Sequence, residues 1–423
     1  MYETEECFMM IKPELRFIGF KGEWESVMFD RIGFTFSGLT GKTKEDFGTG
    51  SSQYITFLNV LNNARINTDI LDNVQVNKIE YQNEVRKGDL FFNTSSETPE
   101  EVGMCSVLDV DIKNVYLNSF CFGFRLIDSN IEPLYIAYLM RSGLGRQKMS
   151  ILAQGATRFN LSKTNFKEIE ILVPSIEEQQ QIATYFVALD KQISSASSRL
   201  ASLKQVKAAS LQAKFPQKGE KVPKIRFNGF EGEWESVKLS SFAKRIMRKN
   251  SNLESTLALT IASTLGLVSQ NDYFNSSVVG ANISNYYLLK KGEFAYNKSY
   301  SNGYPFGSVK RLDRYEQGIL SVLYIVFGID NSISSDYLTH FFDTTLWHKD
   351  VAERAAEGAR NHGLLNISAE DFFDISVLKP KKIEEQQQIA AYFTALDKQI
   401  ALQTQRLEKL KQIKAACLDK MFV

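Results

Sequence analysis

A stretch of 17 residues that occurs twice, 207 positions apart, constrains the fold of this chain most strongly. Residues 177–193 read EEQQQIATYFVALDKQI and residues 384–400 read EEQQQIAAYFTALDKQI, so 15 of the 17 positions are identical. A second pair of segments, PELRFIGFKGEWESV from Pro13 and PKIRFNGFEGEWESV from Pro223, shares 11 of 15 positions. Because the repeats come in the same order in each half, the sequence indicates a tandem duplication.

Both copies of the longer repeat begin a segment whose apolar residues alternate at steps of four and three. This pattern lines up a narrow apolar seam, which a helix buries against another helix. We therefore predict two long helices, at residues 176–215 and 383–423, with seam residues Phe186, Leu189, Ile193, Leu200, Leu203, Phe393, Leu396, Ile400, Leu407 and Leu410. The polar remainder is expected to form a solvated outer face in the first helix: Glu177, Glu178, Gln179, Gln180, Asp190 and Lys191.

The short connection between the two halves sets the direction of the second helix. The linker, residues 216–223, spans at most roughly 27 Å when extended, whereas each helix is roughly 55–60 Å long. The second globular segment must therefore begin near the end of the first helix, and the second helix must run back if the seams pack. We predict an α+β fold of two similar globular units, separated by two long helices that form an antiparallel coiled coil with pseudo-two-fold symmetry.

The two globular units are predicted at residues 13–175 and 224–382, after a leader at residues 1–12. Apolar and aromatic runs at 54–61, 87–95 and 119–127 are typical of strands, and 133–141 begins with proline as helices often do. Segments 288–312, 319–329 and 336–347 take the equivalent places in the second unit. Trp24 and Trp234 are expected to pack in the cores. Since the loop sequences differ, the units should recognise two different targets.

Composition limits the location and the class of protein. The net charge is only +1, so any surface that binds nucleic acid must be local. The cysteines Cys7, Cys105, Cys121 and Cys417 have no metal-ligand spacing, and the acidic N-terminus lacks a signal-peptide pattern. Both observations favour a reducing, cytoplasmic location. No run approaches the roughly 18–20 apolar residues that a membrane span requires, so we expect a soluble protein.

Motifs for catalysis are weak in this sequence. A phosphate-binding loop fails at Lys42-Thr43, because its first glycine would fall on Phe36. Asp109, Asp111 and Lys113 could resemble a nuclease set that binds Mg²⁺, but this short motif arises easily in an exposed strand. The three histidines, His340, His348 and His362, all lie in the second half, so no histidine chemistry is repeated in both units.

Basic and amide-rich loops instead favour binding of nucleic acid. Cations neutralise phosphates, whereas amides and guanidinium groups read base edges. A cluster at 244–249 adds further positive charge, although charge runs in loops are usually just solvated surface. The candidate DNA contacts are Arg158, Asn160, Lys298, Tyr300, Asn302, Tyr304, Lys310, Arg311, Arg360 and Asn361.

The repeated openings, the repeated helices and the loop KKGEFAYNKSYSNGYPFG together resemble the specificity subunit of type I restriction-modification systems. The resemblance covers essentially the whole chain. It implies that each unit is a target-recognition domain that reads one half of a bipartite double-stranded DNA sequence, while the helices set the gap. It also implies no catalysis in this chain, docking of two methyltransferase and two restriction subunits, and S-adenosylmethionine, ATP and Mg²⁺ bound only by those partners.

Two other functions stay open at this stage. A stand-alone two-domain DNA-binding regulator with a coiled-coil spacer would lack enzymatic partners, and a nuclease would cleave DNA in a manner dependent on Asp111. Co-purification of a methyltransferase would argue against the stand-alone regulator. Absence of cleavage by the isolated chain would argue against the nuclease. The DNA target, its spacer length and the half-site read by each unit depend on loop geometry and DNA deformability, which the sequence does not specify.

Overall fold

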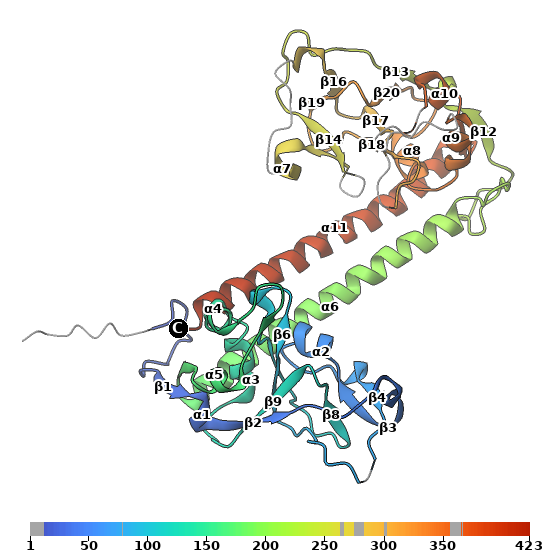
Figure 1. Cartoon of the computed structure of the whole chain (residues 1–423). Helices are drawn as coiled ribbons and strands as arrows, with labels where there is room; N and C mark the ends of the chain where they lie inside the picture. Colours follow the sequence, from blue (N-terminus) through green and yellow to red (C-terminus); the bar gives the residue numbers. More distant parts are fainter. Residues whose placement is uncertain are drawn as a thin grey trace, which may run out of the picture. The chain divides into compact units, whose positions relative to one another are not determined.

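The computed structural model describes residues 12–77, 79–262, 266–274, 283–299, 303–355, 365 and 367–423. The chain divides into two compact units (Figure 1). Unit 1 comprises Met1–Ser197 with Gln405–Val423, and unit 2 comprises Ser198–Thr404. Each long helix is therefore shared between both units. Among the described helices, none combines the length and the apolarity that crossing a bilayer requires.

The framework of unit 1 consists of two antiparallel sheets and four short helices. The first sheet pairs β1 with β11, and the second has the strand order β2-β9-β5-β7. The bounds are β1 Glu25–Met28, α1 Phe29–Ile32, β2 Gly33–Ser37, β5 Leu90–Asn93, β7 Cys105–Val107, β9 Cys121–Leu126, α3 Pro133–Leu139, α4 Gly143–Leu152, α5 Lys163–Lys167 and β11 Glu170–Val173. The runs 87–95 and 119–127 were thus correctly predicted as strands, and 133–141 as a helix.

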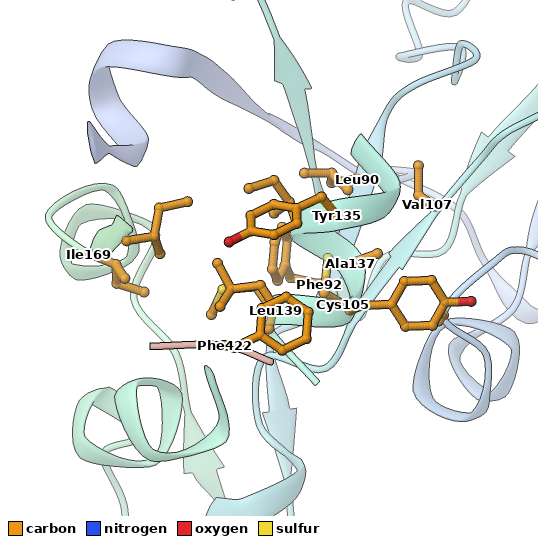
Figure 2. Packing of buried hydrophobic residues seen from close by; sticks show 14 of the residues in the cluster. Leu90, Phe92, Cys105, Val107, Tyr135, Ala137, Leu139, Ile169 and Phe422 are labelled. Carbon is orange, nitrogen blue, oxygen red and sulfur yellow. The ribbon is translucent and has the colours of Figure 1, made fainter. Parts of the chain in front are cut away.

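The main core of unit 1 is aromatic. Phe122 and Phe124 of β9 alternate along the strand, so both side chains point to the same face, where Phe92 of the neighbouring β5 also lies. The Phe166 ring of α5 lies 4.7–5.6 Å from those three rings. Figure 2 shows part of this core, in which Phe92 and Leu90 lie beside α3 and the C-terminal Phe422.

A second layer of unit 1 covers the opposite face of the sheet. It contains a three-stranded sheet of order β4-β3-β8 and a core of its own, which includes Phe91, Ile55 and Leu117. The bounds are β3 Phe47–Ile55, α2 Phe57–Asn62, β4 Asp72–Val74 and β8 Val115–Leu117. The prediction of one strand at 54–61 is therefore wrong. Thr56 accepts a hydrogen bond from the Asn59 N–H and thereby starts helix α2 at Phe57.

Unit 2 repeats this framework. Its sheet order β13-β20-β17-β18 matches β2-β9-β5-β7, and the pair β12 with β21 matches β1 with β11. The framework bounds are β12 Glu235–Lys238, β13 Ala243–Arg245, β17 Phe294–Asn297, β18 Ser308–Arg311, β20 Ile325–Ile329, α8 Ser335–Phe341, α9 His348–Arg354, α10 Ala369–Phe373 and β21 Ser376–Lys379. The parts that differ are helix α7 Gln270–Phe274 and two antiparallel two-stranded sheets, β14 Leu259–Ala262 with β15 Gly266–Ser269 and β16 Tyr287–Lys290 with β19 Gln317–Leu320.

The long helices are α6 Ile176–Lys214 and α11 Ile383–Lys420. Every predicted seam residue is buried or half-buried. Within unit 1, Asp190 of α6 pairs with Lys414 of α11 at 2.5 Å, and Tyr185 Oη lies 3.4 Å from Cys417 Sγ. In α6 the sequence runs from Tyr185 to Asp190 while the partners on α11 run from Cys417 back to Lys414. The two segments are therefore antiparallel.

Unit 2 contains the same set of contacts at the repeated positions. Lys207 of α6 pairs with Asp397 of α11 at 2.7 Å, and Ser210 Oγ lies 2.9 Å from Tyr392 Oη. In both units a lysine–aspartate ion pair fixes the register of α6 against α11. A tyrosine hydroxyl on one helix adds a second contact to the other helix. The antiparallel direction and the two-unit α+β fold that the sequence predicted are confirmed.

The predicted solvated face of the long helices is partly wrong. Glu178 is only 1% exposed, and both its carboxylate oxygens accept hydrogen bonds from the Arg16 guanidinium at 2.7 Å. Gln179 is equally buried, and its amide donates to the carbonyls of Asn130 and Pro174. Asp190 is half-buried by its ion pair. These residues join the helix to its globular unit, so a heptad pattern alone does not reveal them.

The opening segments of the two units pack as predicted. Trp24 is 8% exposed and Trp234 1% exposed, and each contacts an aromatic ring of the helix that follows its sheet. In unit 2, Arg226 donates both to Glu385 Oε1 and to Glu385 Oε2 at 2.7 Å. The repeated arginine and glutamate therefore form the same bidentate ion pair in both units, Arg16 with Glu178 and Arg226 with Glu385.

Candidate nucleic-acid interface

The candidate interface of unit 1 lies at one end of the strands of its four-stranded sheet, where β5 ends and β9 begins. We call this end of the strands the edge of the sheet. The buried Asn93 closes β5: its side-chain amide donates to the carbonyls of Ser95 and Glu101, and its Oδ1 accepts from the Met104 N–H at 2.6 Å. These bonds hold the turn that follows the strand. The short strand β6, Ser95–Ser96, continues from it and presents its edge to a loop from another part of the chain.

That loop carries Arg158 and Asn160. It includes β10, Phe159–Asn160, which pairs antiparallel with β6. Gly155 has a φ of +146°, and a Cβ there would lie 2.0 Å from the Arg158 carbonyl oxygen, so only glycine fits this tight turn. The Arg158 side chain is exposed, and its Nε donates to Ser95 Oγ at 3.2 Å. The exposed Asn160 amide donates to the Arg158 carbonyl at 3.1 Å.

Neighbouring side chains add donors and one aromatic ring to this edge. Lys163 Nζ donates to Ser37 Oγ at 3.2 Å at the end of β2. Thr94 donates from its N–H and its hydroxyl to the Phe120 carbonyl, at 3.0 and 2.9 Å. Lys163, Thr94 and Phe120 are not among the contacts predicted from the sequence. Phe120 stands inside an apolar run that predicts a strand, and nothing in that run distinguishes an exposed position from a buried one.

The equivalent edge of unit 2 carries Lys298 and Tyr304. The Leu365 N–H donates to the Lys298 carbonyl at 2.9 Å, as the Leu161 N–H donates to the Thr94 carbonyl at 2.8 Å in unit 1. Lys298 is half-buried, with its Nζ 3.4 Å from the Ile367 carbonyl oxygen. Tyr304 is half-buried in the connection from β17 to β18. The other candidates of this unit lie outside the described residues: Tyr300, Asn302, Arg360 and Asn361.

Lys310 and Arg311, in contrast, do not lie at this edge. They occupy the far end of β18, opposite Ala295 and Phe294 of β17. Lys310 Nζ pairs with Asp343 at 2.9 Å, and the Arg311 guanidinium pairs with Asp313 and Asp336 and donates to Ser335. Because both charges are already matched by carboxylates, we exclude these two residues from the proposed contacts. The sequence placed them in a basic loop, whereas they belong to a strand.

Asp343 is the centre of a charged cluster between α8, β18 and the long helices of unit 2. It lies 2.9 Å from Lys207 Nζ, 2.9 Å from Lys310 Nζ and 3.8 Å from His340 Nδ1. Burial raises the pKa of this carboxyl, but His340 and the two lysine cations outweigh burial and hold the pKa well below its usual range. The charged form of Asp343 therefore stabilises the folded unit.

Replacing Asp343 by asparagine should lower the free energy of unfolding at pH 7 by about 1.5–3 kcal/mol, the usual worth of charged hydrogen bonds. The folded pKa of Asp343 is depressed, so its contribution is complete above the unfolded pKa, about 3.9, and is lost as pH falls toward the folded value. Urea unfolding of both proteins between pH 7 and pH 3 should show the difference shrinking below about pH 5. A difference that stays constant across this range would contradict the assigned role.

Two arrangements that could support catalysis each have a carboxylate that is already paired with a cation of the protein. Asp109, from the imagined nuclease set, accepts from Arg65 Nε at 2.6 Å, while Asp111 and Lys113 are exposed. Over the described ranges, the one triad with metal-ligand spacing is His340, Asp343 and Asp397. The Lys207 ammonium already lies within 3 Å of both carboxylates in that triad, so a protein cation takes the position of a metal.

Comparisons with known proteins agree with this architecture. Residues 22–205 match the family model described as type I restriction modification DNA specificity domain. The resemblance predicted from the sequence is thereby confirmed: the chain is similar to specificity subunits of type I restriction-modification systems.

Two relatives named as specificity subunits match part of the chain. The StySPI specificity subunit of Salmonella potsdam is 26% identical over 185 residues, which are 43% of this chain and 40% of that protein. The EcoKI specificity subunit of Escherichia coli strain K12 is 25% identical over 171 residues, which are 40% of this chain and 36% of that protein. The chain thus spans about two fifths of the length of the relatives it matches.

Solved structures extend the likeness of the fold to both units. The S subunit of a type I restriction-modification system from M. genitalium superposes with a TM-score of 0.60, covering 98% of this chain and 99% of that one at 14% identity. A chain from a structure on complex assembly of the type I R-M system gives a TM-score of 0.50, covering 94% of this chain and 97% of that one at 16% identity. The whole chain therefore has the S-subunit fold.

Proposed function

We propose that this chain recognises a bipartite double-stranded DNA sequence as the specificity subunit of a type I restriction-modification complex. The observation that carries the proposal is that the same sheet edge recurs in both units with different side chains. Thr94 follows Asn93 at the end of β5 and Lys298 follows Asn297 at the end of β17, and the carbonyl of each accepts a hydrogen bond from the backbone of a loop. A common framework that presents different side chains to the DNA suits two half-sites of different sequence.

Guanidinium, amide and ammonium groups at the edge are the side chains that contact nucleic acid. Arginine pairs with guanine O6 and N7, and asparagine with adenine N6 and N7, both in the major groove. Asn160 belongs to the two-stranded ladder and Arg158 is held by its bond to Ser95, yet both side chains are exposed, so little conformational entropy is lost on binding. Lys298 and Tyr304 would serve the other half-site.

The enzymatic steps are assigned to partner subunits. Both long helices expose the same side chains on the copies of the repeat: Glu177, Gln180, Gln181, Ala188, Lys191 and Gln192 on α6, and Glu384, Gln387, Gln388, Ala395, Lys398 and Gln399 on α11. Two surfaces that share these six side chains suit two copies of one partner, and we propose that this partner is the methyltransferase subunit. Two restriction subunits would join it, with S-adenosylmethionine, ATP and Mg²⁺ bound by the partners and none by this chain.

The alternative of a stand-alone regulator is not favoured, because the matched relatives are named as subunits of restriction enzymes. Affinity purification of this chain from its native cells tests the difference. A methyltransferase recovered at two copies per chain would support the proposal. Recovery of the chain without one would support the regulator.

Replacing Arg158 by alanine should weaken binding to the specific duplex by about 1–3 kcal/mol if the guanidinium reads a base. The target is first defined by mapping methylated adenines in DNA from cells that carry this protein and its partners, and binding is then measured by fluorescence anisotropy at several salt concentrations. Loss of a phosphate contact alone would instead lower the salt slope by about 0.9. Lys113, an exposed cation between β7 and β8, is the matched control, and Lys113→Ala should bind as the wild type does.

A further inference from the structure

Each unit exposes a large apolar side chain at the same place in its framework sheet, and in unit 2 the neighbouring Val322 is exposed as well. Phe120 is 58% exposed and Leu323 is 61% exposed. Phe120 precedes by two residues the Phe122 that pairs with Phe92 of β5, and Leu323 precedes by two residues the Ile325 that pairs with Tyr296 of β17. Both side chains therefore lie in the turns just before the equivalent strands β9 and β20, on the edge that carries the candidate DNA contacts.

Local hydrogen bonds fix both positions. The Phe120 N–H donates to Oδ1 of Asn118 at 2.8 Å, and Asn118 is itself buried and donates to the Ile55 carbonyl at 3.0 Å. In unit 2 the Leu323 N–H donates to Ser321 Oγ at 3.4 Å. Isolated exposed apolar residues are ordinary on protein surfaces. Here, however, the exposure recurs at one position in two units whose turns differ in sequence and hold the residue by different side chains.

The Phe120 ring is close enough to the exposed polar residues to contact the same half-site. The backbone carbonyl of Phe120 accepts hydrogen bonds from Thr94. The Thr94 carbonyl in turn accepts one from the N–H of Leu161, the residue after Asn160. Two steps of roughly 4.8 Å between neighbouring strands place Phe120 about 10 Å from Asn160. At about 3.4 Å per base pair, this distance corresponds to about three base pairs. A single half-site can therefore meet both residues.

We propose that Phe120 and Leu323 determine specificity by packing against the C5-methyl group of a thymine, one in each half-site. This inference rests on the proposed DNA-recognition function. An apolar side chain in the major groove distinguishes thymine by that methyl group, and the Arg158 and Asn160 groups nearby belong to the major-groove code as well. The apolar residue then adds a base preference that hydrogen bonds at this edge do not provide.

The test replaces thymines of the mapped target one at a time by deoxyuridine, which removes the methyl group alone. The complex of the chain with its methyltransferase subunits should lose roughly four-fold in affinity at one thymine of each half-site, the factor expected for one methyl-sized group. The Phe120→Ala complex should bind the unmodified target with this lower affinity. Deoxyuridine at the contacted thymine of one half-site should then cause no further loss of affinity. Leu323→Ala should behave in the same way for the other half-site.

Phe34→Ala is the matched control, because Phe34 is 46% exposed but lies near the opposite end of β2, where it pairs with Arg125. It should retain the wild-type response to every deoxyuridine. A wild-type complex that binds its target but ignores every deoxyuridine would overturn this inference and leave the proposed function intact, whereas absence of any specific binding would overturn both. A third outcome would also overturn the methyl contact: the wild-type complex unstacks bases, as 2-aminopurine fluorescence reports, and Phe120→Ala abolishes this unstacking without changing the response to deoxyuridine. Phe120 would then insert between bases as a wedge.

Discussion

Phe215→Ala is expected to lower the free energy of unfolding of unit 2 by about 3–5 kcal/mol, the usual cost of removing a fully buried phenyl ring. Phe215 directly follows α6 and is 1% exposed. Its ring centroid lies 5.9 Å from Trp234, 5.6 Å from Tyr337 and 5.9 Å from Phe393. The substitution would open a cavity at the place where both long helices and the opening segment of the unit meet.

Native-state hydrogen exchange followed by mass spectrometry measures this loss for each unit separately. Protection should fall in the sheet and helices of unit 2 and stay unchanged in most of unit 1. Phe120→Ala, the same chemical change at a 58% exposed position, serves as the control and should change stability by less than about 0.5 kcal/mol. Equal protection in the Phe215→Ala and wild-type proteins would show that this ring is not part of the core.

Glu385→Ala is expected to destabilise unit 2 by about 3–5 kcal/mol, because it leaves a guanidinium without its partner in a low-dielectric site. Glu385 is 1% exposed and accepts two hydrogen bonds from Arg226, and Trp234 Nε1 donates to it from 3.3 Å. Removal of the carboxylate would therefore weaken the attachment of residues 223–234 to the start of α11. Thermal unfolding followed by tryptophan fluorescence would report the change.

A surface pair from the same segment provides the control for that measurement. Lys221 and Glu233 lie 3.3 Å apart with side chains 57% and 65% exposed, and such pairs contribute little to stability. Glu233→Ala should thus unfold at the wild-type temperature. Replacing Arg226 and Glu385 together by leucines should recover much of the loss, since two apolar groups need no charge partner. A double variant less stable than Glu385→Ala would contradict this explanation.

The repeats made the long helices and their direction predictable. Phe186 and Phe393 occupy equivalent seam positions, and both are fully buried because a step of four and three residues keeps one face of a helix turned to its partner. The strands of the framework were predictable for a similar reason, since β9 has apolar side chains on both faces, with Phe122 and Phe124 in the main core and Cys121 in the second core. The short reach of the linker was enough to predict that the helices are antiparallel.

The polar contacts of the framework were not predictable in the same way. Glu178 and Gln179 look like helix surface because the sequence does not show that Arg16 and the carbonyl of Asn130 come to meet them from other elements. Lys310 looks like a loop cation because its partner, Asp343, is 33 residues away. At the candidate site, Arg158 and Asn160 were identified by residue type, whereas Phe120 depends on exposure, which only the folded sheet defines.

The division of the long helices between the units has a consequence for folding during synthesis. Unit 2 is one uninterrupted stretch, Ser198–Thr404, so its hydrophobic cluster, with Phe215, is available once that stretch has left the ribosome. Unit 1 is interrupted: Cys417, Met421 and Phe422 belong to its main core but are translated after the whole of unit 2. The half made first is therefore the half completed last, against the usual order in which domains fold from the N-terminus onward.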